Sequence, residues 1–285
     1  MAKSPPLPTL LHSLDALRTL VRSRRQSGER IGFVPTMGAL HQGHLSLVDQ
    51  AGQHAQTVIV SIFVNPKQFA PGEDFQSYPR AETEDIDKLA KTAATHVFLP
   101  PPALMYPKGH ATDIVMAGPA SGLETEYRPH FFGGVATVVA KLFNQVQPDC
   151  AVFGEKDYQQ LLVIRQLVQD LDFPIEILSG ATFRETDGLA MSSRNAYLSA
   201  EDRAKAAMLY ATLGWAREAI KGGAVIKTVE TEAAERLRAA GFEPIDYVSV
   251  RDAATLARVG LLDRPCRLLA AAWLGKTRLI DNIAL

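Results

Sequence analysis

The sequence predicts an α/β protein: a Rossmann-like, doubly wound parallel sheet followed by a smaller C-terminal α+β domain. Short apolar runs alternate with helical patterns over the first two-thirds of the chain, as right-handed βαβ crossovers require. After about residue 186, Ala- and charge-rich helical patterns precede short β-rich runs, which is typical of an α+β unit. We therefore expect two domains, residues 1–184 and 185–285, with the boundary in the polar stretch 184–195.

Apolar runs in the first two-thirds of the chain are the expected strands of the large sheet. The run VIVSIFV is apolar at nearly every position instead of at alternate positions. A strand that is buried on both faces has this pattern, as in a parallel sheet covered by helices. The expected strands are residues 31–34, 58–64, 96–99, 151–153 and 175–178.

Helical periodicity predicts the elements between and after these strands. Apolar residues from Val135 to Val146 recur with the spacing of one helix face, which predicts a core-facing helix opened by Gly133 and Gly134 and stopped near Pro148. A second such helix is expected at 161–171. In the C-terminal third, helices are expected at 200–221 and 227–240, and strands at 247–250, 267–272 and 278–283.

The amino-acid composition and charge argue against several classes of protein. Lys and Arg number 30 against 31 Asp and Glu, so the net charge of −1 argues against a dedicated nucleic-acid binder. Cys150 and Cys266 form no CxxC pair, which suits a reduced cytoplasmic compartment and disfavours a structural zinc site. No stretch approaches the ~20 apolar residues of a membrane span, and the N-terminus lacks a signal-peptide pattern. We expect a cytoplasmic protein without membrane or nucleic-acid partners.

An H-x-G-H motif, formed by His41 and His44, lies where the first expected strand turns into a helix. A helix N-terminus is a ready anion site, because free backbone N–H groups and the positive end of the helix dipole point outward. Gly43 would let a ligand approach the backbone closely. A lone histidine is more often structural, but two histidines that flank a glycine at this junction favour a functional site.

Two further polar clusters follow strands: NPKQF at 65–69 and GEKDYQQ at 154–160. In an open α/β sheet, ligands bind outside the carboxyl ends of the strands, so the three clusters should converge on one edge. Lys156 supplies a mobile positive charge for phosphate. Gln68 and Gln160 offer donors and acceptors for a hydroxylated substrate.

Two segments of the expected C-terminal domain allow two interpretations each. In DGLAMSSRN, at 187–195, two serines and Arg194 could close over a triphosphate, or the segment could be a linker that caps the next helix. The residues AAAWLGKT at 270–277 loosely fit a phosphate-binding loop. Such a loop needs a following helix, whereas the residues that follow resemble a strand, so we interpret Gly275 and Lys276 as a hairpin turn.

The motifs VPTMGALHQGH, SIFVNPKQF, YPR, GEKDYQQ and DGLAMSSRN together resemble those of the pantothenate synthetase (pantoate–β-alanine ligase) family. This family belongs to the nucleotidylyltransferase superfamily with a HIGH-type motif. The resemblance implies that ATP and pantoate give pantoyl adenylate and pyrophosphate, after which β-alanine displaces AMP to give pantothenate. It also implies Mg²⁺ with the ATP, a closing C-terminal lid and a homodimer.

The resemblance also implies roles for individual residues. His44 would be the catalytic histidine, aided by His41 and Lys156, and Gln68, Gln160, Asn65 and Arg128 would bind substrate. Phe183 stands where the family usually has a small aliphatic residue whose backbone meets adenine, and Asp85 matches a common polar position. The implied ATP-binding residues are Met37, Gly38, Ala39, Leu40, His41, Gln42, Gly43, His44, Gly154, Glu155, Lys156, Asp157, Phe183, Met191, Ser192, Ser193 and Arg194.

Two other functions compete with this one. Another small-molecule nucleotidylyltransferase, such as a phosphopantetheine adenylyltransferase relative, would share His41 and His44 but stop at the nucleotidyl product. The segments NPKQF and GEKDYQQ and the additional C-terminal domain argue against it. A non-catalytic nucleotide-binding module fits the fold equally well, and AMP release that requires an amine would separate all three.

Overall fold

A computed structural model describes residues 7–285, and the chain divides into two compact units. The first unit runs up to Glu155 and includes Val163–Ala181. The second comprises Lys156–Leu162 and Thr182–Leu285. Whether residues 1–184 and 185–285 are separate domains stays a prediction.

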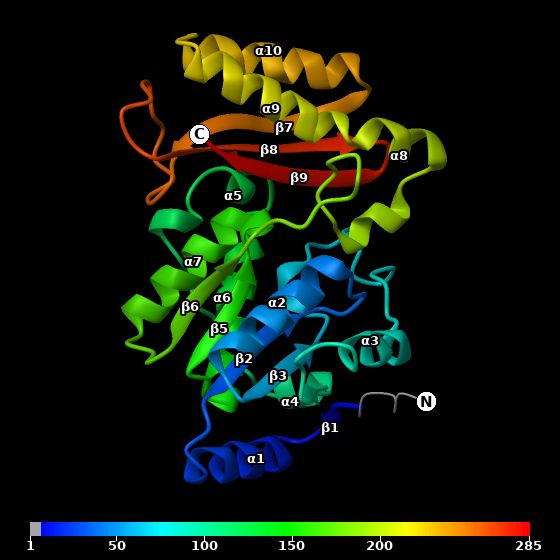
Figure 1. The fold of residues 1–285 in the computed structure, drawn as a ribbon, viewed down its shortest axis with the longest axis vertical. Helices are drawn as coiled ribbons and strands as arrows, with labels where there is room; N and C mark the ends of the chain where they lie inside the picture. Colours follow the sequence, from blue (N-terminus) through cyan, green and yellow to red (C-terminus); the bar gives the residue numbers. More distant parts are fainter. Residues whose placement is uncertain (1–6) are drawn as a thin grey trace. The chain divides into compact units, whose positions relative to one another are not determined.

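The first unit contains a six-stranded parallel sheet (Figure 1) in the order β1-β4-β3-β2-β5-β6. The strands in that order are Thr9–Leu11, His96–Phe98, Thr57–Ile62, Ile31–Thr36, Cys150–Gly154 and Glu176–Gly180. The Rossmann-like prediction is confirmed. Only the edge strand β1 was missed, because three residues are too short for a recognisable pattern. The strand order reverses between β2 and β5, and open α/β sheets bind ligands at such a reversal.

Helices cover both faces of this sheet. Adjacent residues of β2 point to opposite faces, so this strand contacts helices on both sides. Val34 packs in one apolar cluster with Val48 and Ala51 of helix α2 (Gln42–His54). Phe33 faces the other way, and its ring centroid lies 6.3 Å from that of Phe143 in helix α6 (Phe131–Val146). The apolar content of β2 at nearly every position therefore follows from burial on both faces.

The other helical segments before residue 200 include two 13-residue helices, α1 and α7. Helix α1 (Leu14–Gln26) begins at Ser13, whose Oγ accepts a hydrogen bond from the Ala16 backbone N–H at 3.2 Å, as an N-cap does. Helix α7 (Tyr158–Asp170) begins in the second unit and continues in the first. The remainder before residue 200 are α3 (Glu82–Leu89), α4 (Pro102–Met105), α5 (Glu124–Tyr127) and the 3₁₀ turns η1 (Pro66–Gln68), η2 (Gly118–Ala120), η3 (Glu155–Asp157) and η4 (Ser193–Tyr197).

The predicted start of helix α6 is wrong. The helix begins at Phe131, so Gly133 and Gly134 lie inside it instead of opening it. Gly134 is needed for a close approach: a Cβ there would lie 2.2 Å from the backbone oxygen of Lys67 in η1. The helix ends before Gln147, whose φ of 49° is left-handed.

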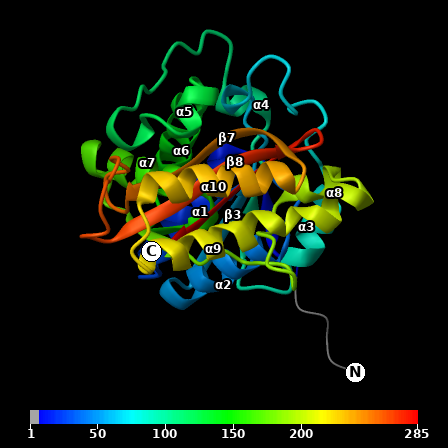
Figure 2. The same ribbon diagram turned by 90° about the horizontal axis from the view of Figure 1, so that it is seen from above.

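The second unit has a three-stranded antiparallel sheet in the order β7-β8-β9. Its strands are Phe242–Asp252, Cys266–Leu274 and Thr277–Ala284. Helices α9 (Met208–Lys221) and α10 (Ile226–Ala239) lie side by side over this sheet in Figures 1 and 2. Alternate residues of β8, Leu268, Ala270 and Ala272, share a buried cluster with both helices.

Two predictions for this unit have different outcomes. Gly275 and Lys276 form the turn between β8 and β9, in which Leu274 pairs with Thr277, so the hairpin interpretation is confirmed. The single helix expected at 200–221 is wrong, because it divides into α8 (Ala200–Ala206) and α9 at Ala207. No Pro or Gly marks Ala207, and its backbone angles stay close to helical, so the pattern gives no sign of the division.

Across residues 7–285, no helix combines the length and the apolar character that a membrane-spanning segment needs. Cys150 and Cys266 are both buried and unbonded to each other.

The contact at Gly134 generates a prediction about stability. In Gly134→Ala, the new methyl group would meet the backbone of Lys67 and Gln68, which cannot move like a side chain. We expect a loss of about 1–3 kcal/mol in the free energy of unfolding, measured in urea. The matched control is Gly214→Ala in α9, where nothing lies within 4 Å of the added methyl group. This control should be stabilised by about 0.5–1 kcal/mol, and an equal response of both variants would contradict the packing argument.

Candidate active site

The H-x-G-H motif lies in a tight turn between β2 and α2. Gly38 and Ala39 have left-handed φ angles of 84° and 50°. Thr36 holds the start of the turn, since its Oγ1 donates to the Ser61 backbone oxygen at 2.8 Å and accepts from the Gly38 N–H at 3.3 Å. His41 is the N-cap of α2. The turn therefore directs the N-terminus of α2 to the carboxyl edge of the sheet, beside the reversal in strand order.

The two histidines cap this helix reciprocally. The Nδ1 atom of His41 accepts a hydrogen bond from the Gly43 N–H at 3.2 Å, and that of His44 accepts from the His41 N–H at 3.3 Å. Their ring centroids are 4.0 Å apart. Because Nδ1 is an acceptor in both rings, a neutral imidazole carries its proton on Nε2. Each ring is thus set as an Nε2–H donor at a helix N-terminus, where anions are favoured.

Asp85 of helix α3 holds the turn from the side. Its fully buried carboxylate accepts from the Ala39 N–H at 2.8 Å and from the Leu40 N–H at 2.7 Å. Burial raises the pKa of Asp85, against the effect of these two bonds. Lys88 donates to the Leu40 backbone oxygen at 2.9 Å. The resemblance gave Asp85 no definite role, and the structure shows that its carboxylate fixes the backbone directly before the H-x-G-H.

Asn65 and Gln68 form a buried amide pair after β3. The Asn65 Nδ2 donates to Gln68 Oε1 at 3.0 Å and to the Gly134 backbone oxygen at 3.1 Å. The Gln68 Nε2 lies 3.1 Å from the sulfur of Met37, which belongs to the turn after β2. Both side chains are at least nine-tenths buried. The predicted meeting of the clusters after the first and second expected strands is therefore present within the first unit.

Arg128 lies against the same segment. Its Nη2 donates to the Gln68 backbone oxygen at 3.0 Å and to Glu73 Oε2 at 2.7 Å, and its Nε donates to Glu73 Oε1 at 3.0 Å. The guanidinium carbon is 4.0 Å from the centroid of the Phe131 ring. Burial alone would raise the pKa of Glu73, but the bonds from Arg128 outweigh it and hold that pKa below its ordinary value.

Gly154 and Glu155 complete the predicted residues of the first unit. Gly154 is the last residue of β5, which pairs in parallel with β2 on one side and with β6 on the other. The carboxyl ends of parallel neighbours lie at the same edge, so Gly154 ends on the edge that carries the H-x-G-H turn.

The other predicted site residues belong to the second unit. Lys156 Nζ lies 3.7 Å from Asp157 Oδ2, and Gln160 follows in the first turn of α7. Phe183 and Met191 are joined by a backbone hydrogen bond of 2.9 Å, from the Met191 N–H to the Phe183 oxygen. Phe183 is 40% exposed, so its ring is not packed in a core.

The serine-rich segment has one structural role that can be assigned. Ser192 is the N-cap of η4, and its Oγ accepts from the Arg194 N–H at 3.3 Å. The capping interpretation of this segment therefore holds for Ser192. Ser193 and Arg194 lie in η4 itself, and their contact with a triphosphate stays a prediction.

Sequence reasoning missed the group that connects these segments, Arg184, Asp281 and Asn282. Arg184 donates to both carboxylate oxygens of Asp281 of β9, at 2.6 and 2.9 Å. Asn282 donates from Nδ2 to the Lys156 backbone oxygen at 2.9 Å. Neighbouring residues of β9 thus fix the hairpin 183–191 and the loop of Lys156. The signal in the sequence was a polar Asp-Asn pair between the apolar residues Ile280 and Ile283.

An open parallel sheet with a capped helix N-terminus at its strand reversal defines a Rossmann-like α/β protein with a ligand-binding edge at that point. The family model described as pantoate-beta-alanine ligase matches residues 9–284. A pantothenate synthetase of Maricaulis maris is 55% identical over 276 residues, or 95% of either chain. This chain belongs to the pantoate–β-alanine ligase family and is a ligase.

Solved structures agree with this assignment. The crystal structure of pantothenate synthetase from Thermus thermophilus matches with a TM-score of 0.91 at 43% identity, covering 96% of this chain and 98% of that one. The pantoate-beta-alanine ligase of Francisella tularensis, solved in complex with beta-gamma ATP and β-alanine, matches with a TM-score of 0.82 at 34% identity over 97% of both chains.

The position of Asp85 generates a prediction about positioning. An amide in Asp85→Asn keeps the volume but directs an NH₂ group at one of the two backbone N–H groups. The turn should shift, and kcat/KM should fall roughly tenfold or more, the effect of leaving a buried donor unsatisfied. Asp87→Asn, on an exposed position of the same helix, is the control. A wild-type kcat/KM with a lowered melting temperature would reduce Asp85 to a purely structural role.

The pair of Arg128 and Glu73 generates a prediction about pH. Because the pKa of Glu73 is lower in the folded state, its ionised form contributes stability above its unfolded pKa of about 4.3. This contribution is lost as the pH falls through the folded pKa. Urea unfolding of wild type and Glu73→Gln should therefore differ by about 1 kcal/mol near neutral pH and converge in acid. A difference that stays constant down to about pH 3 would contradict the assignment.

Proposed function

We propose that this chain joins (R)-pantoate to β-alanine with ATP, through an enzyme-bound pantoyl adenylate, and releases AMP and pyrophosphate. The observation that carries the proposal is the match of the ligase family model to residues 9–284, which include the capped H-x-G-H turn. The Francisella relative, solved with beta-gamma ATP and β-alanine, supports the two substrates named there. The alternative nucleotidylyltransferase reaction would stop before the amine is used.

The carboxylate of pantoate is a poor acylating agent, so it has to be activated before it can react with an amine. In the first step a pantoate carboxylate oxygen attacks the α-phosphorus of ATP, and the bond to pyrophosphate breaks. In the second step the amine of β-alanine attacks the acyl carbon, AMP leaves and the nitrogen loses a proton. The protein must hold the reactants in line and stabilise the charge that develops on phosphate oxygens.

Donors in the H-x-G-H turn suit the first step. We assign His44, with His41, to donation from Nε2–H to phosphate oxygens, because each Nδ1 is occupied as an acceptor. The positive end of helix α2 adds to the effect. Lys156 and Arg194 would supply further positive charge. The proposed ATP contacts are residues 37–44, 154–157 and 191–194 and the backbone of Phe183.

Pantoate has hydroxyl groups that need both donors and acceptors. Gln68 and Asn65 are preorganised, since each amide already holds the other, and Gln160 is assigned to the same substrate. Gln68 is also assigned to the neighbourhood of β-alanine. The Arg128 guanidinium bonds Glu73 and the Gln68 backbone, so we assign it to binding pantoate through the placement of Gln68.

The proposal also includes a metal ion, closure over the nucleotide, an oligomeric state and a cellular compartment. Mg²⁺ would enter with ATP, held by the phosphates. We assign no step to it. An acyl adenylate must be kept from water, so closure of the segment 192–194 over the nucleotide is part of the proposal. A cytoplasmic homodimer is the expected state.

Exchange of labelled pyrophosphate into ATP tests the proposal and the role of His44. Wild type should catalyse this exchange with pantoate alone, because the first half-reaction is reversible without β-alanine. His44→Ala should lose roughly a hundredfold or more, as when an oxyanion-hole donor is removed, while ATP still binds through the backbone of the turn. His54→Ala, at the exposed C-terminal end of the same helix, is the control.

Two results would overturn this assignment. Exchange that strictly requires β-alanine would exclude a separate adenylate intermediate. A His44→Ala enzyme with wild-type exchange would show that the H-x-G-H has only its capping role.

A further inference from the structure

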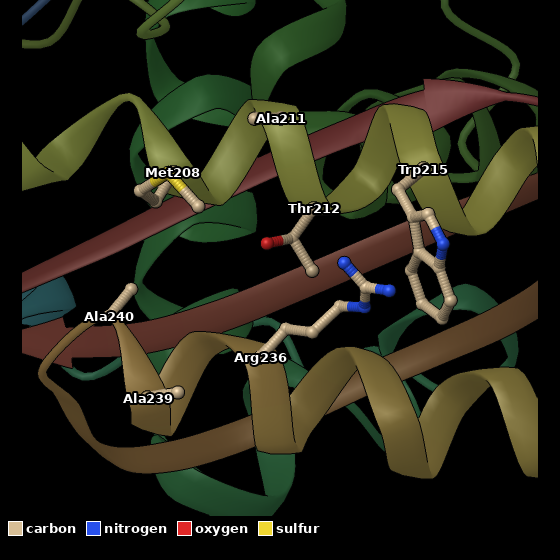
Figure 3. Close-up of a pocket in the computed structure, with 7 residues that line it drawn as sticks. All are labelled: Met208, Ala211, Thr212, Trp215, Arg236, Ala239 and Ala240. Carbon is tan, nitrogen blue, oxygen red and sulfur yellow. The ribbon is translucent and has the colours of Figure 1, made fainter.

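The groove between helices α9 and α10 of the second unit (Figure 3) is mostly apolar. Its lining residues are Met208, Ala211, Thr212, Trp215, Arg236, Ala239 and Ala240. The Arg236 guanidinium carbon lies 3.8 Å from the centroid of the Trp215 ring. Packing on that ring accounts for the position of Arg236, so we assign this groove no ligand.

Tyr106, in the first unit, makes a polar contact that packing does not explain. It directly follows helix α4, and its hydroxyl donates to Asn65 Oδ1 at 2.7 Å across 41 positions of the chain. The ring centroid lies 6.2 Å from that of Phe63, and Lys67 Nζ lies 5.3 Å from the centre of the Tyr106 ring. These contacts fix the ring and therefore the direction of its hydroxyl.

The Tyr106 hydroxyl acts as a donor in this bond. Burial, to which the charge of Asp113 adds, raises the pKa of Tyr106 above its ordinary value. The phenol therefore keeps its proton at neutral pH. The carbonyl oxygen of the Asn65 amide can only accept, so the polarity of the bond is fixed.

With this bond, the polar positions of the Asn65 side chain are all used. A primary amide has two lone pairs on its oxygen and two N–H groups. Oδ1 accepts from the Tyr106 hydroxyl and from the Lys67 backbone N–H at 3.3 Å. Nδ2 donates to Gln68 Oε1 at 3.0 Å and to the Gly134 backbone oxygen at 3.1 Å. The part of Asn65 in pantoate binding would therefore be to hold Gln68.

The orientation of the Gln68 amide follows from Asn65. Because Asn65 Nδ2 holds Gln68 Oε1, the Gln68 NH₂ group lies on the other side, where Nε2 is 3.1 Å from the sulfur of Met37. Gln68 is 8% exposed, against 1% for Asn65, so Gln68 is the member of the pair that a substrate can reach. A thioether sulfur is a weak acceptor, and a substrate oxygen is a better one.

We propose that Tyr106 is a positioning residue for pantoate. Its hydroxyl completes the bonds of Asn65, Asn65 holds the oxygen of Gln68, and the Gln68 NH₂ group is left to donate to a substrate oxygen. The inference rests on the function proposed above and adds a residue to its substrate recognition. Without the Tyr106 hydroxyl, Asn65 Oδ1 is held only by the Lys67 N–H, and both amides gain freedom to turn.

Tyr106→Phe tests this role, because it removes the hydroxyl and keeps the ring that packs on Phe63. Pyrophosphate exchange is measured with pantoate and ATP varied separately. We expect kcat/KM for pantoate to fall roughly three- to tenfold, which corresponds to one hydrogen bond. The KM for pantoate should rise, while the KM for ATP should stay at the wild-type value. Tyr127→Phe, which removes the hydroxyl of a 47% exposed tyrosine in the same unit, is the control and should keep both KM values.

A double-variant cycle tests whether Tyr106 acts through Gln68. Gln68→Ala removes the amide that the network orients. Adding Tyr106→Phe to Gln68→Ala should then change kcat/KM for pantoate less than about twofold, because the two substitutions affect one interaction. The melting temperature of each variant separates this effect from a general loss of stability.

Several results would overturn the role of Tyr106. A wild-type kcat/KM in Tyr106→Phe, with or without a lower melting temperature, would make the hydroxyl purely structural. An equal rise in KM for ATP and pantoate would indicate a general distortion of the fold. Fully additive effects in the double variant would show that Tyr106 does not act through Gln68. A wild-type enzyme that catalyses no exchange with pantoate would instead overturn the proposed function itself.

Discussion

The carboxylate of Asp85 makes the interaction on which the first unit's site depends. A chain that leaves a buried strand and must begin a helix within a few residues has backbone N–H groups with no partner. Here the turn passes through two left-handed residues, Gly38 and Ala39, and Asp85 accepts the N–H groups of Ala39 and Leu40. The direction of helix α2, and with it the position of both histidines, follows from that pair of bonds.

The second unit uses the same physical solution with different residues. Arg184 and Asp281 form a two-bond ion pair, and the adjacent Asn282 holds the backbone at Lys156. In both units, polar groups from a distant part of the chain hold a turn or loop that carries or precedes residues proposed to touch substrate. A buried polar group is costly unless its hydrogen bonds are made. Any movement that breaks these bonds is therefore unfavourable, which keeps the backbone of the site rigid.

Much of this arrangement could be predicted from the sequence, because burial on both faces leaves a pattern. The central strands were recognised by continuous apolar runs, and the motifs at their carboxyl ends follow from the topology of a parallel sheet. Asp85 could not be assigned, since Glu84 and Asp87 beside it are exposed and the three carboxylates look alike. Its spacing of four residues from the buried Leu89 was the available signal. Arg184 and Asp281 lie 97 residues apart, and no local pattern connects them.

The reciprocal cap at the start of helix α2 has a consequence for how this site can change. The Nδ1 atoms of His41 and His44 cap the start of the helix, which leaves Nε2 as the N–H donor of each neutral ring. Replacement of either ring by a residue that supplies only a donor leaves a backbone N–H open. Histidine is the side chain that offers an acceptor and a donor on opposite sides of one rigid ring, so helix geometry alone restricts which residues can occupy these two positions.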